Sequence, residues 1–138
     1  IIDAYIMFLT KEEILEGNKL IAVFMGDYFD TGLEPSYYIR YNKEYKLEDS
    51  QFHCSWDWMM PVVDKINGMG KAYSFAIFKS YVSLTVEKGG KVFKDYSFAY
   101  SEYITPTQTG KEAAFKLLVK FVKWENENLL KSELAIPL

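Results

Sequence analysis

Apolar residues recur at helical spacing in three stretches of this chain, and the first begins after Thr10. It ends near Met25, where Gly26 suits the left-handed residue that follows many helices. Thr10 and Glu13 have the spacing of a capping box, in which each side chain accepts a hydrogen bond from the backbone N–H of the other residue. Gly17 marks either close packing against a second helix or a break between two shorter ones.

The second stretch, residues 52–66, is predicted to contain the central helix around which the rest of the chain packs. It holds the one His, the one Cys and two of the three Trp of the chain. Ser55 or Asp57 would cap this helix, and Pro61 is tolerated only near its start. The apolar stripe predicted to be buried comprises Trp58, Met59, Val62, Val63 and Ile66.

The third stretch begins at a second capping box, Thr109 to Glu112, and runs from Lys111 to about Asn126. Its predicted outer face carries three lysines, which favour a solvated surface over a surface for an acidic partner. Residues 127–138 show no clear pattern and are predicted to be a docked or mobile tail. The lysines are Lys116, Lys120 and Lys123, and the buried face is Ala114, Leu117, Leu118, Phe121 and Trp124.

Alternating apolar residues between these helices predict β-strands, with odd positions apolar from Tyr73 to Ile77 and even positions apolar from Val82 to Val86. The change of parity indicates a bulge or tight turn across residues 78–81. A three-residue loop at Lys88–Gly90 would place Glu87 opposite Lys91, Val86 opposite Val92 and Val82 opposite Tyr96, with the partner strand at residues 92–100. Earlier in the chain, 27–36 has turn chemistry, 37–41 is a short strand candidate and 42–51 is a polar loop.

Together these elements predict one α+β domain over residues 1–138, with 1–9 as an N-terminal extension. An antiparallel sheet of three to four strands would pack between or against three main helices, in a sandwich-like αβα arrangement. The first helix on the opposite face of the sheet from the other two is one version of this arrangement.

The composition disfavours several classes of function. A net charge of −3 and a single Arg, Arg40, make nucleic-acid binding an unfavoured prediction, since phosphate neutralisation supplies most of that affinity. One Cys and one His give no ligand spacing for a metal, so neither a metal nor a cofactor is predicted. No apolar run reaches the ~18 residues of a membrane span, and a lone thiol suits a cytoplasmic location.

Catalytic chemistry has few candidates. Cys54 and His53 would form a nucleophilic pair only if the imidazole reached the sulfur, which sequence neighbours seldom do, so a buried thiol beside a loop His is the favoured reading. Asp57 would serve as a general acid if burial raised its pKa, but a helix-capping role suffices to explain it. No catalytic residue is therefore predicted.

Aromatic side chains are the better candidates for binding, because aromatic residues make up 17% of the chain and Trp and Tyr are enriched at binding interfaces. Trp56 would be rotated away from the buried stripe of its helix. The predicted binding residues are Trp56, Tyr28, Tyr37, Tyr38, Tyr41 and His53. The alternative is that these aromatics merely close over the core.

Three runs in this order, LIAVFMG at 20–26, SWDWMMPVVDKI at 55–66 and GKEAAFKLLVKFVKW at 110–124, resemble small bacteriophage and prophage proteins with the phage ABA sandwich domain. The resemblance covers about residues 10–126, without the 27–51 segment and the tail. It implies a sheet between helical layers, a phage-related origin and a location in the host cytoplasm. It carries over no functional residue.

The leading functional hypothesis is a non-enzymatic protein that binds a host or phage macromolecule or associates with itself. The alternative is a protein that binds a small, nucleotide-like molecule in a pocket lined by the predicted aromatics. A hydrolase that uses Cys54 and His53 ranks third.

Overall fold

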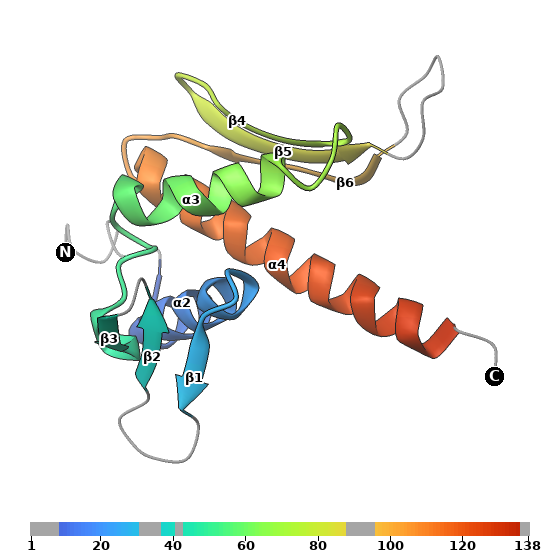
Figure 1. Ribbon diagram of the computed structural model, residues 1–138. Helices are drawn as coiled ribbons and strands as arrows, with labels where there is room; N and C mark the ends of the chain where they lie inside the picture. Colours follow the sequence, from blue (N-terminus) through green and yellow to red (C-terminus); the bar gives the residue numbers. More distant parts are fainter. Residues whose placement is uncertain (1–8, 31–36, 41–42, 88–95, 136–138) are drawn as a thin grey trace.

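The chain has an α+β fold in the computed structural model, which describes residues 9–30, 37–40, 43–87 and 96–135 (Figure 1). Three helices and two small antiparallel sheets make up this part of the chain. In order, the elements are α2 (Lys11–Phe24), β1 (Tyr28–Asp30), β2 (Tyr37–Arg40), β3 (Lys43–Lys46), a 3₁₀ turn (Leu47–Asp49), α3 (Trp56–Asn67), β4 (Tyr73–Ile77), β5 (Tyr81–Glu87), β6 (Tyr96–Tyr103) and α4 (Gly110–Ala135).

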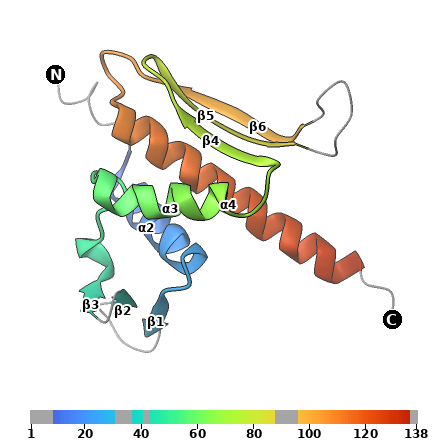
Figure 2. The same ribbon diagram turned by 45° about the horizontal axis from the view of Figure 1, so that its top comes forward.

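The larger sheet, β4-β5-β6, covers one side of α3 and α4, and α2 lies against α4 on the side away from this sheet (Figures 1 and 2). All three described helices therefore lie on the same side of the sheet, and the sheet packs against the helices. The version with the first helix on the opposite face is wrong. The small sheet β1-β2-β3 lies beyond α2, at the far end of the molecule from the large sheet.

Helix α4 contacts more of the major elements than any other helix does: α2, α3, β5 and β6 all pack on it. The prediction that the 52–66 helix is central is therefore wrong, although its buried stripe is confirmed for Met59, Val62, Val63 and Ile66. Because α4 lies between the sheet and α2, it is buried on two sides. Ala113, Phe115 and Val122 are buried in addition to the predicted Ala114, Leu117, Leu118 and Phe121, whereas Trp124 is partly buried.

The close approach of α2 and α4 occurs at Gly17. A Cβ atom added there would lie 2.5 Å from Phe115 Cζ and 2.9 Å from Val119 Cγ2. Helix α2 runs through this position without a break, so Gly17 serves close packing. Both predicted ends of α2 are confirmed: Thr10 caps it with a complete capping box, and Gly26 follows with φ 81°.

The β4–β5 pair confirms the alternation, with Phe75 opposite Leu84 and a tight turn at 78–81. The predicted β5–β6 register is wrong, because Val86 pairs with Phe98 and Val82 with Glu102. The observed register places a charge near the end of the core-facing row, at Glu102, which accepts a hydrogen bond from Gln108. The predicted register would have set a charge in the middle of this row, with Lys94 opposite Leu84. The observed register sets Tyr100 there instead, and residues 88–95, including the predicted loop, lie outside the described ranges.

Two further segments differ from prediction. Residues 42–51 were expected to be a loop, yet β3 pairs with β2 and a 3₁₀ turn follows. Helix α4 continues to Ala135, nine residues past its predicted end at Asn126, so most of the predicted tail is helical. No helix in the described ranges combines the length and apolar character needed to cross a membrane.

Candidate functional site

The structure does not bring His53 and Cys54 together as a catalytic pair. His53 Nδ1 lies 3.1 Å from the Nδ2 of Asn18, a buried residue of α2, while Cys54 is exposed. The Asn18 amide donates this bond, so His53 Nδ1 is the acceptor and the ring proton is on Nε2. Among the described residues, no hydrogen bond joins the imidazole to the sulfur, and the two residues lack the geometry of an activated nucleophile.

His53 is held in a largely apolar setting. Its ring packs edge-on against Phe115, with centroids 6.0 Å apart. Burial lowers the pKa of His53 below its ordinary value of 6.5, because desolvation disfavours the imidazolium. The side chain is therefore neutral at physiological pH and joins the 50–54 turn to α2 and α4.

Trp56, the first predicted binding residue, is partly buried and belongs to the periphery of the core. Its ring lies over the start of α4, where a Cβ added to Gly110 would be 3.7 Å from Trp56 Cζ2. Trp56 therefore contacts the start of α4, a neighbour that the sequence did not predict for it. Among the other predicted residues, Tyr28 lies on β1, Tyr37 and Tyr38 lie on β2, and Tyr41 lies outside the described residues.

Arg40, the only arginine, was not predicted to be a functional residue; it is the last residue of β2 and is buried. Its guanidinium carbon lies 4.8 Å from the centroid of Phe52 and 4.6 Å from that of Trp58, within cation–π range. Burial raises the pKa of Asp27, and the charges of Arg40 and Lys65 oppose that rise. This cluster fastens β2 to the start of α3.

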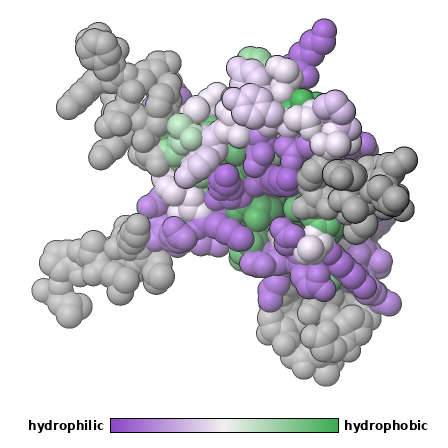
Figure 3. Space-filling model, turned by 180° about the vertical axis from the view of Figure 1, so that it is seen from behind, coloured by the Kyte–Doolittle hydropathy of each residue, from purple (hydrophilic) through white to green (hydrophobic). Residues whose placement is uncertain are grey.

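On the outer face of the large sheet, which points away from the helices, the described rows from Tyr81 to Thr85 carry no charged side chain, and Glu87 follows them at the end of β5. Residues at the same level of neighbouring strands share a face, so the pairing defines the rows of this surface. Two rows consist of small side chains: Ala76, Ser83 and Ser101, and then Ser74, Thr85 and Ala99. In the space-filling view, the sheet end of the molecule is pale, which indicates intermediate hydropathy (Figure 3).

A third row on this face is aromatic. Phe78 stacks on Tyr81 with ring centroids 4.6 Å apart, and Tyr81 lies 6.2 Å from Tyr103. Phe78 is 46% exposed and Tyr103 is 66% exposed, although both are held in fixed positions by their strands or turn. We call Phe78, Tyr81 and Tyr103 the aromatic row. Preordered, exposed aromatics of this kind are typical anchors of protein interfaces.

The predicted outer lysines of α4 lie between α2 and β6 and line two hollows. The first, about 290 Å³, has Gly17, Phe115 and Val119 on its walls, with Glu13, Glu16 and Glu102 among its charged residues. The second, about 210 Å³, is lined by Phe98, Tyr100, Trp124 and Glu127, and Lys120 and Lys123 line both. Neither hollow is lined by the aromatics that were predicted to form a small-molecule pocket.

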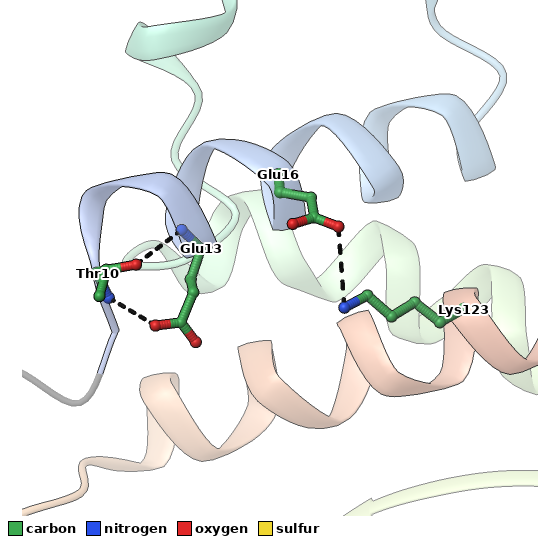
Figure 4. A network of polar contacts seen from close by, with 4 residues as sticks. All are labelled: Thr10, Glu13, Glu16 and Lys123. Atoms are coloured by element: carbon green, nitrogen blue, oxygen red, sulfur yellow. Dashed lines mark hydrogen bonds and ion pairs between the residues drawn. The ribbon is translucent and has the colours of Figure 1, made fainter.

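The lysines are partly engaged within the protein. Lys123 Nζ lies 3.9 Å from Glu16 Oε1, close to the Thr10–Glu13 capping box (Figure 4). Lys120 Nζ lies 4.4 Å from the centroid of Tyr100, and Lys116 donates to Gln108 Oε1. The sequence pattern had located these lysines on one helix face, but not the hollows beside them. Within the described ranges, no group of three or more His, Cys, Asp or Glu side chains is placed to hold a metal ion.

Comparison with known proteins gives no relative: no family model, no curated protein and no solved structure matches this chain.

Proposed function

We propose that this protein is a non-enzymatic interaction protein, and that the outer face of the β4-β5-β6 sheet is where it binds another protein. The aromatic row carries this proposal. Phe78 and Tyr103 are exposed, and the partly exposed Tyr81 packs between them on the β4–β5 hairpin beside β6. Rigid aromatic side chains bury a large area at little entropic cost when a partner covers them.

The two rows of small side chains beside the aromatic row make the surface suitable for a protein. They leave a shallow, uncharged area next to the projecting rings, so that a partner can approach closely without desolvating a charge. The sequence resemblance to phage proteins supports a host or phage macromolecule in a bacterial cytoplasm as this partner.

Site-specific photo-crosslinking tests the proposal. A photoreactive phenylalanine analogue replaces Tyr103 in one protein and Val23 in a control, because Val23 is exposed on α2, away from the sheet. We expect one protein to be cross-linked in a bacterial lysate from position 103 and not from position 23. The cross-linked protein, purified, should then bind the unmodified chain, and Phe78→Ser should weaken that binding by about tenfold or more.

The same cross-linked species from both positions would overturn the proposal. Equal affinity of the purified partner for the original chain and for the Phe78→Ser variant would overturn it as well. Leu129→Ser, which removes an exposed apolar side chain from α4, is the matched control and should leave the affinity unchanged.

A further inference from the structure

The two edges of the β4-β5-β6 sheet differ in how their outward backbone groups are bonded. At the β4 edge, the N–H of Tyr73 donates to Gly70 O at 3.1 Å and the N–H of Phe75 donates to Asn67 Oδ1 at 2.8 Å. The chain thus closes most of this edge with its own atoms. An edge left open offers a template for another strand.

The β6 edge is the open one. Ile104 N–H donates to Ser80 O at 2.9 Å, so residue 104 directs its backbone groups toward the β5 side. Every second residue of an antiparallel strand does the same. Phe98, Tyr100 and Glu102 therefore direct their backbone groups toward β5. Ala99 and Ser101 therefore direct theirs outward. Within the described structure, the N–H groups of these two residues have no hydrogen-bond partner, and the segment from Phe98 to Tyr103 contains no Lys or Pro to protect the edge.

We propose that β6 pairs with β6 of a second copy of this chain, so that the two sheets join into one six-stranded antiparallel sheet. A two-fold axis at Tyr100 lets Ala99 N–H donate to the partner's Ser101 and Ser101 N–H donate to the partner's Ala99. Symmetry doubles these to four hydrogen bonds. The two Tyr100 rings, each 48% exposed in one copy, become a cross-strand pair.

Charge complementarity favours a second copy as the occupant of this edge. The pairing sets Glu102 of each copy opposite the partner's Phe98, on the side of the sheet that faces α4. Phe98 lines the hollow that also contains Lys120 and Lys123. Glu102 already lines a hollow with Lys120 and Lys123 of its own chain and accepts a hydrogen bond from Gln108 Nε2, and the pairing would bring it beside the same two lysines of the partner. No like charges are brought together along the paired strands.

This inference deepens the proposed function, since it gives self-association its own surface, but it uses the β6 edge and not the aromatic row. The junction is small compared with a stable dimer interface, so we expect a dimer that forms at micromolar concentrations. Sedimentation equilibrium of the full chain should show a shift from 16.1 kDa toward twice that mass as concentration rises. A chain that stays monomeric throughout the micromolar range overturns the inference.

Two variants locate the interface. Ser101→Pro removes the outward N–H and leaves the β5 ladder intact, so it should abolish the dimer, whereas Ser101→Ala keeps the N–H and should leave the dimer unchanged. Circular dichroism checks that both variants are folded. A dimer that survives Ser101→Pro but is lost in Phe78→Ser would move self-association to the aromatic row and overturn the inference.

Charge reversal provides a test that does not depend on comparing stabilities. Glu102→Lys and Lys120→Glu each place like charges across both halves of the junction, so each variant alone should dimerise about tenfold more weakly. An equimolar mixture should restore the dimer, because a Lys then meets a Glu in both halves. A mixture that associates no better than its components overturns the inference, since repulsion within each chain is the same before and after mixing.

Discussion

Gly17 on α2 lies directly against Phe115 on α4, and a Cβ atom at Gly17 would be 2.5 Å from the tip of that ring. Phe115 is buried, so the ring tip has little room to withdraw. The absence of a side chain at one residue thus sets how closely two helices approach.

We expect Gly17→Ala to destabilise the protein by about 1–2 kcal/mol. Overpacking costs typically about 1–3 kcal/mol, and the better helix propensity of Ala returns up to about 1 kcal/mol. Urea denaturation measures the change. Gly110→Ala is the matched control, because an added Cβ would meet its nearest neighbours at 3.5 and 3.7 Å, which is ordinary contact. Equal stability of the two variants would contradict the close-packing role of Gly17.

Arg40 should contribute to stability through its contacts with Phe52 and Trp58. Arg40→Ala removes a buried guanidinium that lies over both rings, together with the packing of its aliphatic stem. We expect the free energy of unfolding to fall by about 2 kcal/mol or more. Lys43, the cross-strand neighbour of Arg40, is exposed, and Lys43→Ala should stay within about 0.5 kcal/mol of the unmodified protein. A similar small effect at both positions would refute this role for Arg40.

His53 should make the stability depend on pH. Because burial lowers its pKa in the folded state, the unfolded chain takes up a proton first as the pH falls below about 6.5. The free energy of unfolding should therefore decline between about pH 6.5 and the lower folded-state pKa, and this part of the decline should be absent in His53→Gln. Other groups contribute, since burial also raises the pKa of Asp27 and of Glu125.

For that reason the quantity to measure is the difference in unfolding free energy between the original chain and His53→Gln, from pH 8 to pH 5 by urea titration. As the pH falls, the free energy of unfolding of the original chain should decrease relative to that of His53→Gln. A difference that stays constant over this range would show that His53 has the same pKa in both states.

Only part of the candidate site could be predicted from the sequence. The high aromatic content indicated a binding surface, but the residues chosen, among them Trp56 and His53, are engaged with α4 and with Asn18. Phe78 and Tyr81 are close in the chain, but Tyr103 is distant and joins them only through the pairing of β6 with β5. The strand alternation of 73–77 and 82–86 contained part of this signal, because Phe78 and Tyr81 occupy the positions between the two apolar rows.

What the sequence by itself determined is local. The Thr10–Glu13 capping box, the end of α2 at Gly26, the buried stripe of α3 and the alternation of β4 and β5 were predicted correctly, because each depends on residues within a few positions of one another. The choice of α4 as the central element, the β5–β6 register and the placement of α2 were decided only in the tertiary structure. They depend on which apolar surfaces fit together across the whole chain. The pattern of apolar residues along the chain predicts which face of an element is buried, but it does not predict which other element covers that face.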